Sequence, residues 1–349
     1  MPARQRRVAA FAAGLAISVA ALWILVSSVD LAATSAALGR ARIEWLVPIA
    51  GVLAVQLMLR TFRWSRLAAT LRPEAPVPAL RFVAPLVIGY LGNAVLPARL
   101  GEAVRAAILG RAERLPIASV LGTVLVERIV DTLTLAVLAG VVASAIAPVW
   151  IARLAVAVAV VGVIGLIVLV VGGRILATAL RTATSGPLHR AATVAGGAIV
   201  NIATAVAGIP RTVLALAVVV SIAAWFCDAL LFWLVSSSLG IGLSLPMAFL
   251  VGAVTVLGTA IPSLPGYVGT FEAAAVGAAV AFGVPSADAL AFAVLAHACS
   301  TIPVASLGAI ALVRRGLGRA DLAEAAAAAR SQAAPLSPRE ASGTPLSRA

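Results

Sequence analysis

The sequence predicts an all-α, polytopic membrane protein with about eight transmembrane helices and two re-entrant broken elements. Of its 349 residues, 62% are hydrophobic and only 11% are charged, and the mean hydropathy is +1.10. Apolar runs long enough to cross a bilayer recur along the chain, separated by short segments that contain arginine. Two further apolar runs are interrupted by proline and glycine, which do not continue a helix. Together these three observations exclude a soluble domain with a single hydrophobic tail.

The basic residues indicate membrane topology and not nucleic-acid binding. All 26 Lys and Arg positions are arginine, and most lie in short loops between apolar runs. Apart from the short RTFRW at residues 60–64, aromatic residues do not alternate with arginine as in single-strand binders. We therefore expect no nucleic-acid partner. Cys227 and Cys299 lie inside apolar runs and are expected to be packing residues, and the spacing predicts no metal site or cofactor.

The chain begins with a basic segment, residues 1–7, followed by an apolar run over residues 8–29. This run is longer than the core of a typical signal peptide, so we expect the first transmembrane helix, starting in the cytoplasm. After a polar connection, a second run over residues 45–62 ends in a series of arginines. These are Arg60, Arg63, Arg66 and Arg72. Positive-inside anchoring and contact with anionic lipid explain most of the series, while a direct substrate role for Arg60 or Arg63 stays open.

The first broken element covers residues 80–114. An apolar approach ends at Pro97, and a new helical pattern follows in which Arg99, Glu102 and Arg105 recur at three-residue steps. This spacing places the three side chains on one face of a helix. Charges at membrane depth need water, a partner or a ligand. A solvated cytoplasmic helix is one interpretation, but a second broken element later in the chain favours a short helix that lines a polar cavity.

Polar residues also interrupt the later spans. Residues 117–147 contain Glu127, Arg128 and Asp131, which form either a structural ion pair or contacts with the first broken element across a cavity. Residues 154–171 predict a plain lipid-facing helix, and residues 173–211 predict a loop or surface helix in which His189 is solvated. The next span, residues 212–239, contains Asp228, which needs a partner arginine or a proton-linked role.

The second broken element covers residues 245–284. Its apolar half stops before Pro262 and Pro265, and a new helix begins near Thr270 with Glu272 in the first turn. Glu272 there is either a helix cap or a site residue. The last span, residues 287–313, contains His297, which either packs by hydrogen bonding or faces a cavity. We therefore expect one membrane domain, residues 1–318, followed by a disordered cytoplasmic tail, residues 319–349.

The two broken elements share a sequence pattern. Residues 91–104 and 257–274 both read Leu-Gly-x-Ala and an aliphatic residue, then proline, glycine and a glutamate that opens an alanine-rich helix. Counting arginines places the first element on the cytoplasmic side and the second on the opposite side. Similar broken segments that enter from opposite faces are typical of an inverted-repeat transport fold. The predicted topology is six full spans plus two re-entrant pairs, with both termini in the cytoplasm.

Four motifs in this order also resemble a known family: RTFRW at 60–64, GNAVLPARLGEAVR at 92–105, ERIVD at 127–131 and PSLPGYVGTFEAA at 262–274. They resemble the flippase-like transmembrane domain of lysylphosphatidylglycerol synthases, over about residues 8–316. The resemblance implies a multi-pass protein of the bacterial plasma (inner) membrane that moves an anionic phospholipid or lipid-linked phosphate between leaflets. The expected substrate-binding residues are Asn93, Arg99, Glu102, Arg105, Glu127, Arg128, Asp131 and Glu272.

Three functions follow from these observations. A lipid flippase or transporter, with membrane lipids as partners and homo-oligomerisation left open, is the function we favour. A membrane scaffold or partner subunit without transport is the alternative, and a lipid-linked glycosyltransferase is weaker because no nucleophile or paired-aspartate metal motif is present. The synthases continue into a soluble aminoacyl-transferase domain, whereas only the low-complexity residues 319–349 follow here, so we expect no enzymatic activity.

Overall fold

The computed structural model describes residues 3–96, 100–146, 206–261 and 263–317, together with Val160, Ile164, Ile175 and Glu324. In these segments every regular element is a helix, which confirms the predicted all-α class. Several sequence predictions lie outside the described residues. They are Pro97, Arg99, Pro262, His189, the span at 154–171, most of the segment 173–211 and nearly all of the tail.

Four helices of the described segments are long and apolar enough to cross a membrane, which makes this a multi-pass membrane protein. The first is Ile43–Ala69, which joins η1 (Ile43–Trp45) to α3 (Leu46–Ala69). The others are α6 (Ile117–Ile146), α10 (Arg211–Ser238) and α13 (Ser286–Arg314). The described part of the chain thus shows four clear spans of the roughly eight predicted.

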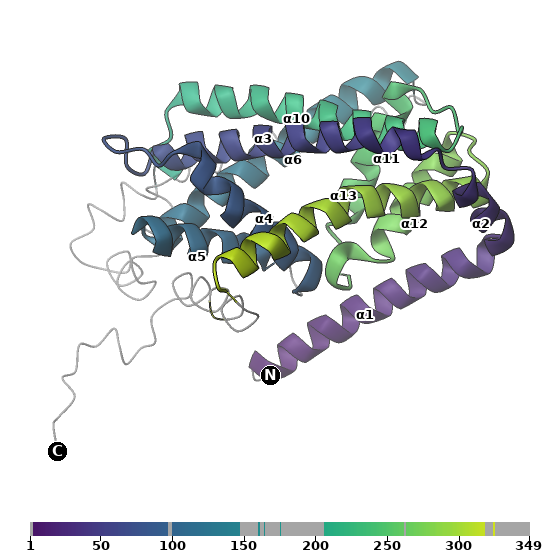
Figure 1. Cartoon of the computed structure of the whole chain (residues 1–349), viewed down its shortest axis with the longest axis horizontal. Coiled ribbons are helices and arrows are strands. Elements are labelled where there is room, and N and C mark those ends of the chain that lie inside the picture. Colours follow the sequence, from purple (N-terminus) through teal and green to yellow (C-terminus); the bar gives the residue numbers. More distant parts are fainter. Residues whose placement is uncertain are drawn as a thin grey trace.

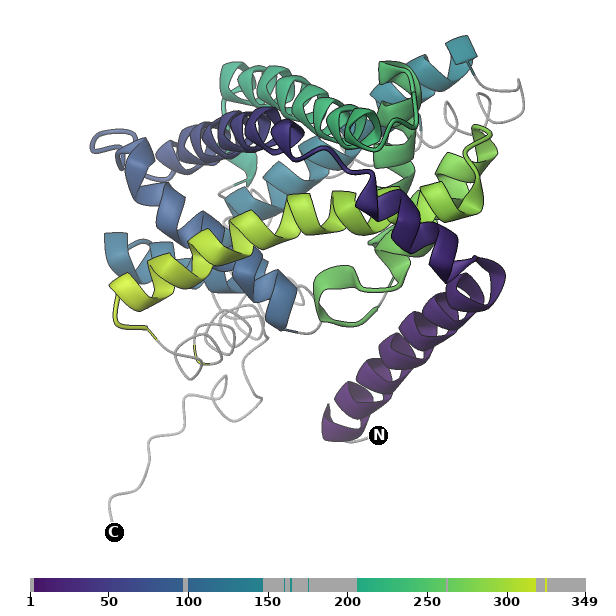
Figure 2. The same cartoon turned by 45° about the vertical axis from the view of Figure 1, so that its right-hand side comes forward.

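The N-terminal helix α1 (Ala3–Ser28) is followed by a second helix, not by the predicted polar connection. Asp30 caps α2 (Leu31–Gly39) because its carboxylate accepts hydrogen bonds from the backbone N–H groups of Ala32 and Ala33. The part of α1 from Leu15 and helix α2 are bent by 88° and count as a fifth span if taken together. Figures 1 and 2 show α2 as the sharp corner between α1 and the rest of the molecule.

Both broken elements form the predicted pairs of short helices. In the first, η2 (Ala79–Phe82) leads into α4 (Val83–Val95), which packs against α5 (Gly101–Glu113). In the second, α11 (Leu245–Gly258) connects through η4 (Pro265–Tyr267) to α12 (Thr270–Ala281), and α11 packs against α12.

The glycine of each Leu-Gly-x-Ala pattern lies where its two helices meet. A Cβ atom at Gly92 would stand 2.9 Å from the Cα atom of Gly101, and one at Gly258 would stand 2.5 Å from the Cβ atom of Ala274. Both glycines therefore allow a separation that a larger residue would prevent.

Of the five apolar clusters in the described segments, the two largest lie one around each broken element. The larger cluster joins α10, α11, α12 and α13 and contains the contacting rings of Phe232, Phe271 and Phe292. The smaller one joins α3, α4, α5 and α6 and contains the edge-to-face pair of Trp64 and Phe82. Helix α3 packs along α10, and α13 packs along α4, so each long helix ties one half to the other. Polar side chains collect between the two clusters.

Candidate functional site

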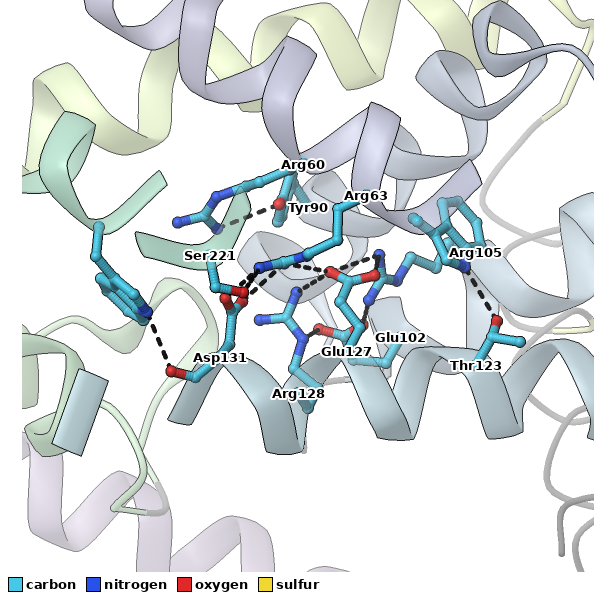
Figure 3. A network of polar contacts seen from close by, with 12 residues as sticks. Arg60, Arg63, Tyr90, Glu102, Arg105, Thr123, Glu127, Arg128, Asp131 and Ser221 are labelled. Atoms are coloured by element: carbon cyan, nitrogen blue, oxygen red, sulfur yellow. Dashed lines mark hydrogen bonds and ion pairs between the residues drawn. The ribbon is translucent and has the colours of Figure 1, made fainter. Parts of the chain in front are cut away.

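Arg63 is the centre of a buried polar network. Its position on α3 turns the guanidinium toward α6 and α10, and only 1% of the residue is exposed. Nη2 donates to Glu127 Oε1 at 3.0 Å and to Asp131 Oδ2 at 2.9 Å. Nη1 donates to the other Asp131 oxygen and to Ser221 Oγ, the latter at 2.6 Å. One arginine thus bridges three helices at a depth where solvent does not reach (Figure 3).

Arg105 brings the first broken element into the same network. From α5, its Nη1 lies 3.2 Å from Glu127 Oε2 and its Nη2 lies 2.6 Å from Glu102 Oε2. The guanidinium also lies over the ring of Trp64, 4.7 Å from the centroid, in a cation–π contact. Trp64 is held in place because its indole N–H donates to Thr123 Oγ1 at 3.3 Å. Arg105 therefore connects α5 to α3 and α6 at once.

Two more arginines complete the network and are less enclosed. Arg128 pairs with Glu102 at 3.3 Å and with Glu127 at 3.2 Å, while 35% of its side chain stays exposed. Arg60 pairs with Asp228 at 3.0 Å and donates to Tyr90 Oη at 3.3 Å. Of the two alternatives for Asp228, the structure shows a partner arginine, which is Arg60. The Nε–H of Arg60 has no hydrogen-bond acceptor among the described residues.

Among the residues that the structure describes, the network contains equal numbers of positive and negative groups. Four arginines (Arg60, Arg63, Arg105 and Arg128) contact four carboxylates (Glu102, Glu127, Asp131 and Asp228). Buried charges are tolerated when they are paired and hydrogen-bonded, as here. Both interpretations of the residues on α6 apply: Glu127 and Arg128 contact the first broken element, and Asp131 forms a structural pair. Its partner is Arg63 and not the neighbouring Arg128.

A cavity of about 340 Å³ opens beside this network. Its polar wall comes from the helices α3, α4, α5, α6, α10 and α13 and from the end of α11. It includes Gln56, Arg60, Tyr90, Asn93, Glu102, Arg128, Asp131, Thr132, Asp228, Thr259, His297, Ser300 and Thr301. The turn between α11 and α12 adds Gly266 and Tyr267. Both broken elements therefore reach one cavity. Arg105 and Glu127 are not part of the wall; they lie behind Glu102 and Arg128 and hold them in position.

In each broken element a polar side chain accepts a hydrogen bond from a backbone N–H group at the start of the second helix. Glu272 accepts a hydrogen bond from the Gly269 N–H at 2.7 Å, which confirms the helix-cap interpretation. Its other oxygen lies 2.6 Å from His297 Nδ1, and the imidazole stacks on Phe271 with centroids 4.3 Å apart. His297, not Glu272, lines the cavity. In the first element, Asn93 Oδ1 accepts the N–H of Gly101 at 2.9 Å.

Sequence reasoning identified most of the charged members but not the whole arrangement. Arg63 appeared as a member of an arginine series with a substrate role left open, and its pairing with Glu127 and Asp131 was not predicted, although its three-residue spacing from Arg60 places both on one helix face. Tyr90 and Ser221 were missed, because a single tyrosine or serine in an apolar helix gives no distinctive signal. Arg99 lies outside the described residues, so its binding role stays a prediction. Within the described segments, no group of three His, Cys, Asp or Glu side chains could hold a metal ion.

The family comparison agrees with the motifs that build this network. The model described as "Lysylphosphatidylglycerol synthase TM region" matches residues 11–308. The chain belongs to this family. The match includes every residue of the charged network and both broken elements, and it ends inside α13. No curated protein matches the chain.

Proposed function

We propose that this protein is a flippase-like transporter that moves an anionic phospholipid or lipid-linked phosphate between the leaflets of the bacterial inner membrane, without enzymatic activity. One observation carries the proposal: a polar cavity lies among membrane-spanning helices, with two arginines in its wall and both broken elements around it. A head group can be solvated there while its chains stay in lipid, which is the basic requirement for crossing a bilayer.

The two wall arginines suit a phosphate. Guanidinium groups bind phosphate oxygens through several parallel N–H donors. Arg60 has an unused Nε–H, and the Arg128 side chain is one-third exposed. Each already pairs with a carboxylate, Arg60 with Asp228 and Arg128 with Glu102. A phosphate would therefore exchange for an existing partner, which keeps binding reversible and couples occupancy to the positions of α5 and α10.

The arrangement of the broken elements supports alternating access. Each has a short apolar helix, a close glycine contact and a returning helix that begins with a capped first turn. We infer that α4–α5 and α11–α12 are re-entrant pairs related as an inverted repeat, together with six full spans. Figure 1 shows the C-terminal ends of α3 and α13 at the same end of the molecule. Arg72 follows α3, and Arg314 is the last residue of α13. By the positive-inside rule we propose that this end is cytoplasmic, with both termini on the cytoplasmic side.

The test is exchange of a fluorescent anionic phospholipid between leaflets of liposomes that contain the purified full chain. The informative variant is Arg60→Gln with Asp228→Asn, which removes one wall arginine and keeps the network neutral. The control is Arg72→Gln, which removes an arginine at an exposed position beyond α3 and leaves the network intact. We expect exchange by the wild type and the control, and a rate at least about tenfold lower in the double variant, as follows from losing one charge-assisted phosphate contact of about 1.5–3 kcal/mol.

A scaffold without transport is the second candidate, because the network is neutral and nearly self-sufficient in the absence of a ligand. Wild-type protein that accelerates no exchange of phosphatidylglycerol, phosphatidic acid or a polyprenyl phosphate would favour this role. Exchange that is fast in the wild type and equally fast in the double variant would instead place the transport path away from this cavity.

A further inference from the structure

An apolar groove lies on the outer side of the cavity, between α3 and α13. Its volume is about 660 Å³, and the start of α4 closes one end. The walls are almost entirely aliphatic or aromatic and include Ala54, Met58 and Phe62 of α3 and Leu307 and Ile310 of α13. Several of these side chains face outward; Met58 is 68% exposed. Both helices are membrane spans, so this groove faces the bilayer interior.

The groove has the length of one lipid leaflet. Its wall on α3 runs from Ala50 to Phe62, twelve residue steps that correspond to about 18 Å at the rise of an α-helix. The hydrocarbon core of a bilayer is about 30 Å thick, so one leaflet contributes about 15 Å. A single extended chain fits this length, whereas a spanning helix of a partner protein would require about twice as much.

One polar atom in the groove has no partner. Thr61 is 5% exposed and lines the groove, yet its Oγ1 makes no hydrogen bond to any described residue. A threonine inside a helix commonly donates to the carbonyl one turn earlier, so an unpaired buried hydroxyl is unusual. It lies at the Phe62 end of the groove, five residues before the exposed Arg66, where a lipid's ester group would be found if its chain ran toward Ala50.

The groove and the polar cavity share part of their walls. Leu53, Leu57 and Val304 line both spaces, and Arg60 follows Leu57 by three residues on α3. The two spaces therefore adjoin at these three aliphatic side chains, and an amphipathic molecule could lie partly in each. The combination of an apolar groove, one unpaired hydroxyl and an adjoining cavity with arginines matches an amphipathic ligand.

We propose that this groove is the lateral entry site of the lipid, in which one ester-linked acyl chain lies between α3 and α13. The Thr61 hydroxyl donates to the ester carbonyl, and the phosphate head group passes between Leu57 and Val304 into the cavity. This assignment rests on the proposed transport function for the head-group part only. The chain-binding part stands on the groove itself and is tested by binding.

The first test fills the groove. Ala54→Trp places an indole in the groove, whereas Val55→Trp places the same indole at the next position of α3, which is 50% exposed and not part of the groove. Binding of dioleoyl phosphatidylglycerol to detergent-purified protein is measured by native mass spectrometry, and leaflet exchange is measured in liposomes. We expect Val55→Trp to behave as wild type and Ala54→Trp to lose at least about tenfold in lipid affinity, with exchange lowered in parallel.

The second test addresses the hydroxyl. Thr61→Val keeps the shape of the side chain and removes the donor, so affinity for the diester lipid should fall about two- to twelvefold, the range of one hydrogen bond. A diether analogue, which lacks the carbonyl, should bind wild type and variant equally. Equal losses for both lipids would overturn the role of Thr61.

The outcomes separate this proposal from the transport function. Lipid binding that Ala54→Trp abolishes, in a protein that does not accelerate exchange, would support the groove and refute the transporter. Fast exchange and unchanged binding in Ala54→Trp would refute the groove and leave the transporter standing. Unchanged lipid binding together with a changed oligomeric state in Ala54→Trp would also refute the groove as a lipid site and would assign it to a second copy of the chain.

Discussion

Replacing Arg63 with methionine should destabilise the protein more than any other single change to the network. Arg63 is 1% exposed and contacts Glu127, Asp131 and Ser221. Methionine fills part of the space but leaves the buried network with three positive and four negative groups. Breaking a buried pair from one side costs about 3–5 kcal/mol, because the remaining charge has no compensation. We expect a loss of unfolding free energy in this range.

The compensated variant gives the sharper result. Arg63→Met with Asp131→Asn restores neutrality, so the double variant should be more stable than Arg63→Met alone by about 1–3 kcal/mol. The control is Arg66→Met on the same helix, which is exposed and loses only a cation–π contact with Phe62, 4.9 Å from the ring, worth about 0.5–1 kcal/mol.

The assay is reversible unfolding of the purified protein in mixed micelles, with denaturing detergent as the variable and helix content and tryptophan fluorescence as probes. Two outcomes would refute the reasoning. One is an Arg63→Met variant as stable as Arg66→Met. The other is additive losses in the double variant, which would mean that the network is hydrated and that its charges do not compensate one another.

Two further predictions concern the broken elements. Gly101→Ala should lower the unfolding free energy by about 1–3 kcal/mol in the same assay, because its Cβ atom would collide with the Gly89 carbonyl oxygen. The control is Gly51→Ala, at an interior position of α3 where a Cβ atom would have no neighbour within 4 Å; it should raise the unfolding free energy by roughly 0.5–1 kcal/mol. If Gly101→Ala left the unfolding free energy unchanged, α4 and α5 would not be tightly packed. Glu272→Ala should lower the unfolding free energy by about 0.5–2 kcal/mol, because the helix loses its cap. Glu272→Gln should lower it less, because the amide oxygen can still accept the hydrogen bond from the Gly269 N–H. Equal losses in both variants would assign the stabilisation to the contact with His297 instead.

The sequence predicted the elements well where composition or proline decides the structure. Long apolar runs predict membrane-spanning helices, because within lipid a single segment can form hydrogen bonds for all its backbone groups only as a helix. The break of the second element near residue 261 follows from the loss of backbone N–H groups at prolines and from glycine conformations such as φ +91° at Gly269. The helix α2 was missed because its signals, a capping Asp30 and nine small or aliphatic residues, are too short to distinguish from a loop.

The site was predicted less completely, because charge pairing depends on which helix faces cross. Spacing along α6 placed Glu127 and Asp131 on one face, and it also allowed Arg128 to pair with Asp131. Only packing decides between this local pair and the pair across helices, and Arg63 of α3 takes Asp131. A bidentate guanidinium from another helix satisfies both carboxylate oxygens, which a neighbour on the same helix reaches poorly, so the tertiary pair is the stronger choice.

The neutrality of the network bears on how a lipid could be selected. A cavity with surplus arginines would bind any phosphate tightly and release it slowly. Such binding would be equally strong in every conformation of the protein, so it would not favour the change from one conformation to another. Under the proposed function, a phosphate that takes the full guanidinium of Arg60 or Arg128 displaces Asp228 or Glu102, and these carboxylates belong to different helices, α10 and α5. The difference between two strong interactions is small, so affinity stays moderate. Whether the exchange of partners is favourable depends on the charge distribution of the ligand. Binding of the ligand would move α10 and α5, because these helices carry the displaced carboxylates.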